Sequence, residues 1–175
     1  PVEKIYWLIE DAKRYGTLPF AGLARAAFMA VQLLKSLVTV GVFTELDYEC
    51  FLAGISTVSG QMQLDKINMT KAEFLIRYGH LRPGTYDILS PRYDEAPDLY
   101  FDWEQQASAG SGSVETFLPT PEQLSEIDSL LRRHKIDVNA LELITFMRSA
   151  IEQRELAKFE FTHNLSEALS LINQT

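Results

Sequence analysis

The chain has 175 residues, of which 46% are hydrophobic, and its formal net charge at pH 7 is −8. This length and composition are typical of one folded domain with a real core. The negative charge argues against nucleic acid and against an anionic membrane as partners, because both select a surplus of Lys and Arg. A single cysteine, Cys50, excludes an internal disulfide and is typical of a reducing compartment. We therefore expect a cytoplasmic protein whose partners are small molecules or other proteins.

The N-terminal part of the chain predicts two helices. Apolar residues recur at helical spacing over 2–15, and Gly16 is expected to end this helix. A second helix over 20–40 is apolar on nearly every side, which predicts a place at the centre of a bundle. Arg25 and Lys35 interrupt it, so the sequence holds no uncharged apolar run of about 18 residues that would predict a membrane span. The chain opens on helix without an initiator Met or a signal peptide, and we expect a piece of a longer protein.

Capping residues predict where the next helices begin. Thr44 and Asp47 form a capping pattern before a helix with apolar positions as far as Val58, and Gly60 is expected to end or bend that helix. The polar stretch 61–68 fits either a continued helix or a loop.

Two capping boxes follow further along the chain. Thr70 and Glu73 open a short helix that Gly79 is expected to close. Thr120 and Gln123 flank a proline at the first position of another helix.

The C-terminal part predicts one long helix. His134 is expected in the last turn of the preceding helix, and Asp137 is expected to cap the long one. That helix either runs on to Ile172 or breaks near Asn164. No segment alternates with period two, so we predict an all-α fold, a multi-helix bundle within a single domain over 1–175.

One segment lacks helical periodicity and is rich in polar chemistry. The crossing segment, residues 79–103, contains Pro83 and Pro91, which disfavour helix in the residues before them. Its Gly, Pro, Tyr and charged residues predict an irregular but ordered path across the bundle. The stretch 105–115 has no large apolar residue except Val114 and predicts a flexible internal loop.

The candidate binding residues lie in the crossing segment and on the last helix. They are His80, Arg82, Tyr86, Asp87, Arg92, Tyr93, Arg154 and Lys158. No phosphate loop, zinc-protease motif, nucleophile elbow or paired-cysteine motif is present, so we expect no catalytic residue, metal ligand or cofactor-binding residue in this chain.

The charged candidates have two readings each. His80 could donate to a bound hydroxyl or phosphate as an imidazolium, favoured by the helix end before it, or it could cap that helix. Arg82 and Arg92 could grip phosphate or carboxylate, or they could pair with Asp87 and Asp94 or the adjacent Glu95 and hold the segment in shape.

The remaining candidates also have two readings. Tyr86 and Tyr93 either line a pocket or plug the end of the bundle. Arg154 and Lys158 belong either to a solvated helix face or to a pocket wall next to aromatic residues.

Two strings in the chain resemble phosphoenolpyruvate-utilising enzymes related to phosphoenolpyruvate synthase and rifampicin phosphotransferase. The first runs from the residue before the crossing segment into it and matches the family at Tyr78, Gly79, His80, Arg82, Gly84, Asp87, Pro91, Arg92, Tyr93 and Glu95. The second is on the last helix and matches at Arg154, Glu155, Lys158 and Phe159. Leu81 and Thr85 stand where the antibiotic-modifying branch carries an Arg and an acidic residue.

The resemblance implies a role within a larger enzyme. It implies that this chain is a helical substrate-binding or hinge domain, beside an ATP-grasp domain and a phosphohistidine domain of the same protein. ATP and Mg would act in the parent enzyme and not here, and the acceptor would be a small molecule held against the helices. The alternative is a non-catalytic helical interaction or scaffold module, in which the crossing segment is only a structural latch.

Overall fold

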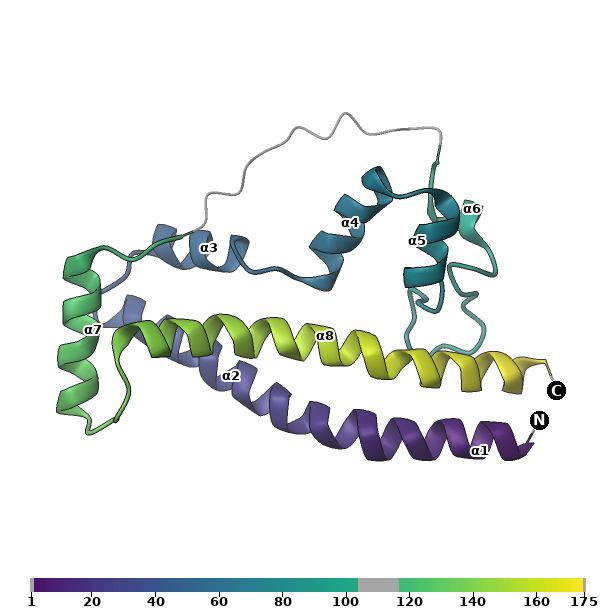
Figure 1. The fold of residues 1–175 in the computed structure, drawn as a ribbon, viewed down its shortest axis with the longest axis horizontal. Helices are drawn as coiled ribbons and strands as arrows, with labels where there is room; N and C mark the ends of the chain where they lie inside the picture. The colour runs from purple at the N-terminus through teal and green to yellow at the C-terminus, as the bar shows by residue number, and fades with distance from the viewer. Residues whose placement is uncertain (1, 104–116, 175) are drawn as a thin grey trace. The chain divides into compact units, whose positions relative to one another are not determined.

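The structure, a computed structural model, describes residues 2–103 and 117–174 (Figure 1). Within these ranges the chain is helical and holds no strand, which confirms the all-α prediction. The loop predicted over 105–115 lies outside the described residues. The elements in order are α1 (Val2–Asp11), η1 (Ala12–Thr17), α2 (Leu18–Thr39), α3 (Glu45–Ala53), α4 (Val58–Asn68), α5 (Lys71–Tyr78), α6 (Pro97–Tyr100), α7 (Pro121–Arg133) and α8 (Ala140–Asn173).

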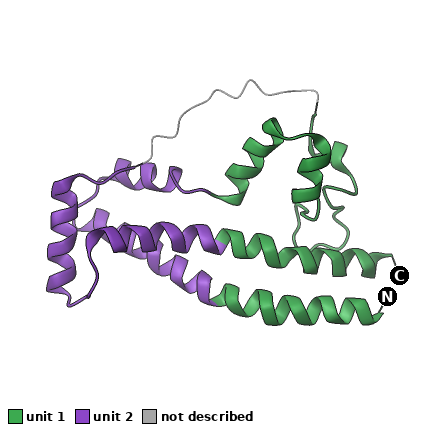
Figure 2. Ribbon diagram, in the orientation of Figure 1, with its two compact units in different colours: residues 1–21, 57–110, 155–175 green, residues 22–56, 111–154 purple. Residues whose placement is uncertain are grey.

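The chain packs into two compact units (Figure 2). Unit 1 comprises 1–21, 57–110 and 155–175, and unit 2 comprises 22–56 and 111–154. Among the described residues, the chain passes from one unit to the other within α2, between α3 and α4, and within α8. A single domain over the whole chain stays a prediction.

The N-terminal helix does not end at Gly16. α1 passes directly into η1, a six-residue π-helical stretch, and then into α2. A Cβ added at Gly16 would lie 2.5 Å from the Cβ of Phe161 on α8. The prediction of a helix end was wrong because Gly16 permits this close approach between helices and does not terminate one.

The second predicted helix, α2, is buried on one stripe and not on every side. Its charged residues Arg25 and Lys35 are exposed, as predicted. Phe28 and Met29 are 65% and 58% exposed, which contradicts the prediction of a central helix. The buried positions recur at helical spacing, at Ala27, Ala30, Leu34 and Leu37.

The continuous helix Val2–Thr39 is long and apolar enough to cross a membrane, judged by length and composition only. The core helix of a soluble protein passes the same test, so length and composition fit both a membrane-spanning helix and a core helix.

The helix predicted to run to Val58 is in fact two helices. α3 ends at Ala53, and Gly54 is its C-cap. The Thr57 hydroxyl accepts a hydrogen bond from the Gly60 amide and begins α4. Gly60 therefore lies in the first turn of a helix, and the ambiguous stretch 61–68 is helical.

The three predicted capping boxes are confirmed, and the predicted cap of the last helix is wrong. In each box the threonine hydroxyl accepts from the backbone amide three residues later, and the side chain of that later residue accepts from the threonine amide. The pairs are Thr44–Asp47, Thr70–Glu73 and Thr120–Gln123. At α8 the capping residue is Asn139 and not Asp137, since Asn139 Oδ1 accepts from the Glu142 amide at 3.0 Å. α8 then continues through Asn164 without a break.

Unit 2 has its own apolar core, drawn from α2, α3, α7 and α8. Its most buried side chains are Leu34, Phe51, Ile127 and Met147. Cys50 packs against this core and is a free thiol, as predicted.

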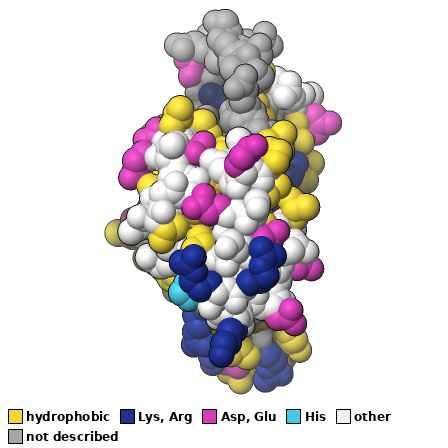
Figure 3. Space-filling model, turned by 90° about the vertical axis from the view of Figure 1, so that its left-hand side faces the viewer, with side chains coloured by type: hydrophobic (Ala, Val, Ile, Leu, Met, Phe, Trp, Pro, Cys, Tyr) yellow, Lys and Arg dark blue, Asp and Glu magenta, His cyan; other side chains and the backbone are white. Residues whose placement is uncertain are grey.

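The C-terminal end of α7 is basic. Arg132, Arg133, His134 and Lys135 are all exposed, and His134 is the C-cap. Figure 3 shows Lys and Arg side chains gathered beside a His on this face. Cations at this helix end complement its dipole.

Candidate functional site

The crossing segment folds back on itself immediately after α5. The Tyr93 amide donates to the Leu81 carbonyl at 2.8 Å, and the Asp94 amide donates to the Gly79 carbonyl at 3.1 Å. A Cβ added at Gly79 would lie 2.8 Å from the Cβ of Asp94. Gly79 is thus the C-cap of α5, and its lack of a side chain lets the returning chain at Asp94 approach. The prediction of an irregular segment is confirmed, except that residues 97–100 form the one-turn helix α6.

Arg82 is the most deeply placed charge of this segment, at 6% exposed. Its Nη1 donates to the backbone carbonyls of Asp87 at 3.3 Å and Ser90 at 3.1 Å. Its Nη2 donates to Ser166 O and Oγ, each at 3.2 Å, and to Ser170 Oγ at 3.0 Å. The expected ion pair with the Asp87 carboxylate is not made, because Asp87 Oδ1 accepts from the Leu89 amide instead. Arg82 therefore ties the segment to α8.

A carboxylate completes this network. Ser170 Oγ donates to Glu95 Oε1 at 2.8 Å. Burial raises the pKa of Glu95, but the Arg92 amide, Ser170 and the charge of Arg82 together hold it below its usual value. The crossing segment therefore reaches α8 through both a cation and an anion.

Arg92 makes the pairing that the sequence predicted, and one more. Its Nε and Nη2 bind the two carboxylate oxygens of Asp94, and its Nη1 donates to Glu167 on α8 at 3.1 Å. Its backbone amide donates to Glu95 Oε2 at 2.8 Å. A bidentate pair of this kind fixes the guanidinium plane, so Arg92 is a second tie to α8.

His80 is buried against α8, and its surroundings lower its pKa. Its Nε2 lies 3.3 Å from the Phe159 carbonyl, and its ring lies 4.8 Å from the Phe159 ring and 4.5 Å from the His163 ring. Burial first, and the nearby His163 second, lower its pKa to about 4. The expectation of a charged His was wrong because desolvation outweighs the helix dipole here.

The two tyrosines of the segment behave differently. Tyr93 is half-buried, and the centre of its ring lies 5.1 Å from that of Tyr100 and 4.9 Å from that of Phe101. This packing agrees with the interpretation that Tyr93 fills space and does not line a pocket. Tyr86 is 70% exposed and plugs nothing.

The two candidates on the last helix belong to different units. The guanidinium of Arg154, in unit 2, lies 5.8 Å from the Phe28 ring. Lys158, in unit 1, is exposed. The exposure of Lys158 agrees with a solvated face, whereas Arg154 is half-buried.

One buried carboxylate was missed from the sequence. Asp65 of α4 is 5% exposed and accepts hydrogen bonds from Gln61 Nε2 at 2.6 Å, Arg77 Nη1 at 2.8 Å and the Tyr78 hydroxyl at 2.8 Å. Burial raises its pKa, but these three partners hold it below its usual value. Burial and the bond to Asp65 raise the pKa of Tyr78 to about 12. Asp65 therefore links α4 to α5.

The α8 partners of Arg82, Ser166 and Ser170, were also missed. Thr162, whose hydroxyl donates to the Phe159 carbonyl, continues their four-residue spacing, and all three are buried. This stripe of small polar residues was the sequence signal for a face that receives a polar segment.

Within residues 2–103 and 117–174, no group of three or more His, Cys, Asp or Glu could hold a metal ion. Comparison with known proteins gave no match to a family model, to a curated protein or to a solved structure.

Proposed function

We propose that this chain is a helical connecting domain of a multidomain ATP-dependent phosphotransferase of the phosphoenolpyruvate-utilising group. The observation that supports it most is that the two strings resembling this group, far apart in the sequence, contact each other in unit 1. The rings of Tyr78 and His80 lie 5.7 and 4.8 Å from the ring of Phe159. Contact between the two resembling stretches is expected if both belong to one domain shared with this group of enzymes.

The contacts favour a hinge or connecting role over a substrate-gripping one. A guanidinium that binds phosphate must present free donors. Arg82 uses both terminal nitrogens on protein oxygens, and Arg92 uses all three nitrogens on Asp94 and Glu167. These bonds therefore tie the crossing segment to the C-terminal part of α8.

In the parent enzyme, ATP and Mg would act in a nucleotide-binding domain, and a histidine of another domain would carry the phosphoryl group. His80 is not that histidine, because its ring is buried and its Nε2 faces the Phe159 carbonyl. Of the eight candidates, the exposed ones that could face a small acceptor molecule are Tyr86, Asp87 and Lys158.

Labelling with ATP tests this proposal. We expect the parent protein, incubated with ATP labelled in the transferred phosphate and Mg, to form an acid-labile phosphohistidine outside residues 1–175. We expect the 175-residue chain alone to remain unlabelled. A parent protein that takes no phosphate from ATP, or a label on His80, would contradict the proposal.

A second candidate, an interaction module, is favoured by the exposure of α1. No residue of α1 is buried, and the paired rings of Tyr6 and Trp7 are each 55% exposed. Large exposed aromatic residues often mark protein interfaces. If the chain is an interaction module, Trp7→Ser should abolish its association with another protein, and the parent protein should not be labelled by ATP. Labelling of the parent protein by ATP would favour the phosphotransferase proposal instead.

A further inference from the structure

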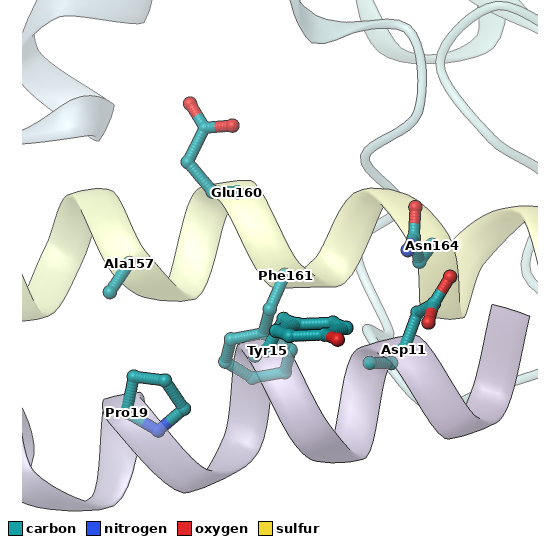
Figure 4. Close-up of a pocket in the computed structure, with 9 residues that line it drawn as sticks. Asp11, Tyr15, Pro19, Ala157, Glu160, Phe161 and Asn164 are labelled. Carbon is teal, nitrogen blue, oxygen red and sulfur yellow. The ribbon is translucent and has the colours of Figure 1, made fainter.

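Unit 1 contains a pocket outside the network of Arg82 and Arg92. It has a volume of about 430 Å³ and lies between α8 and the N-terminal helix at η1 (Figure 4). None of the eight residues predicted from the sequence to bind a ligand lines it.

The pocket lies where the N-terminal helix changes its geometry. η1 takes the π-helical form over Ala12–Thr17. Such stretches are rare in proteins overall, and those that occur are often found at functional sites. Gly16 within it makes the close approach to Phe161, so α8 and the N-terminal helix touch at this point. The hollow lies beside this contact, between Tyr15 and Pro19 on one helix and Phe161 on the other.

The lining combines negative charge with aromatic and polar groups. Asp11, Tyr15, Glu160 and Asn164 line the pocket, whereas no Lys or Arg does. In the described part of the chain, the side chains of Asp11, Glu160 and Asn164 make no hydrogen bond or ion pair. Figure 4 shows Asp11 and Asn164 at one end of the pocket, on facing helices, and Glu160 extending away on the outer side of α8.

We propose that this pocket binds an organic cation, a primary ammonium group on a short apolar or aromatic stem. The ammonium would donate to the carboxylate of Asp11 and to the amide oxygen of Asn164, and charge-assisted bonds of this kind are the strongest available to it. The stem would lie against Phe161 and Pro19, and the faces of Phe161 and Tyr15 attract a cation. The net charge of −8 favours the approach of cations to the protein.

The same lining disfavours the other ligand classes. Phosphate and carboxylate ligands would meet the carboxylate of Asp11 and no cation. A metal ion would find too few oxygen ligands, since no three acidic, His or Cys residues gather in the described ranges. The inference therefore does not rest on the proposed phosphotransfer role, whose ligands are anionic.

An NMR titration of the 175-residue chain with phenethylammonium chloride tests the site. We expect the amide resonances of Tyr15, Gly16, Phe161 and Asn164 to shift, with a dissociation constant in the millimolar range. 2-Phenylethanol has the same stem without the charge, and we expect it to bind at least about tenfold more weakly.

Single substitutions test which side chain binds the ammonium group. Asp11→Asn removes the carboxylate inside the pocket and should raise the dissociation constant about tenfold, and Asn164→Leu should raise it about threefold. Glu160→Gln should raise it less than twofold, because that carboxylate extends away from the pocket. Glu126→Gln, an exposed acid of unit 2, is the matched control and should change nothing.

Three results would overturn the inference. They are equal binding of phenethylammonium and 2-phenylethanol, shifted resonances outside the lining residues, and unchanged affinity in a folded Asp11→Asn protein. Asp11 is exposed and unpaired within the described residues, so this variant should fold; tryptophan fluorescence checks it, and Asn164→Leu gives the same decision independently.

Discussion

Replacing Arg82 by methionine tests whether the crossing segment is held by this one side chain. Methionine keeps the unbranched stem but removes all five hydrogen bonds. A hydrogen bond to a charged group contributes about 1.5–3 kcal/mol, and a buried carbonyl left unpaired costs about 1–3 kcal/mol. The two serine hydroxyls can rotate to other partners, and the Ser166 carbonyl lies inside α8, where helical geometry gives it a backbone donor. The Ser90 carbonyl lies outside any helix and loses this donor.

Part of this loss is offset. Burying a guanidinium is costly, and Arg82 Nε has no hydrogen-bond partner within the described residues, so methionine removes that cost as well. Balancing these effects, we expect Arg82→Met to lower the free energy of unfolding of unit 1 by about 3 kcal/mol.

The assay is urea unfolding followed by tryptophan fluorescence. Both tryptophans, Trp7 and Trp103, belong to unit 1, so the signal reports that unit. Arg14→Met is the matched control, because Arg14 is an exposed arginine of the same unit and should change stability by less than about 0.5 kcal/mol. A loss below about 1 kcal/mol in Arg82→Met would refute the reasoning that this network holds the segment.

Two further predictions concern pH and helix packing. The pKa of His80 is about 4 when folded against 6.5 when unfolded, so the unfolded chain binds more protons between these values and stability falls as the pH falls through them. We expect His80→Gln to flatten this dependence in urea midpoints measured at each pH, and exposed His134→Gln to leave it unchanged; equal slopes in both variants would be the contrary result. Gly16→Ala places a Cβ 2.5 Å from Phe161 Cβ and should cost about 1–3 kcal/mol, whereas Gly22→Ala meets open space in a helix and should add about 0.5–1 kcal/mol. Thermal unfolding followed by circular dichroism compares them, and equal stability would contradict the close contact.

Local chemistry made much of the fold predictable. A capping box involves residues only three apart, so Thr44, Thr70 and Thr120 could be assigned without knowledge of tertiary contacts. The prediction of a helix end at Gly16 was wrong because the role of this glycine depends on a distant contact. A glycine required for contact with Phe161 has the same sequence appearance as one that ends a helix, and only the packing partner distinguishes them.

The candidate site was less predictable because its partners lie far along the chain. Arg92 could be paired with Asp94 from the sequence because the two are only two residues apart, and this pair is confirmed. The sequence could not show that Arg82 binds Ser166 and Ser170, which are more than eighty residues distant. Burial also depends on the whole fold, and it reversed the expected charge state of His80.

The most direct test of the central claim, that the crossing segment acts structurally within a phosphotransferase, is acceptor kinetics in the parent protein carrying Arg82→Met. The measurement is made at a temperature where tryptophan fluorescence shows unit 1 folded. A structural role predicts that KM for the acceptor is unchanged and that kcat stays within about twofold of the unmodified protein. A KM raised about tenfold or more in the folded variant would show that Arg82 binds substrate and would contradict the account.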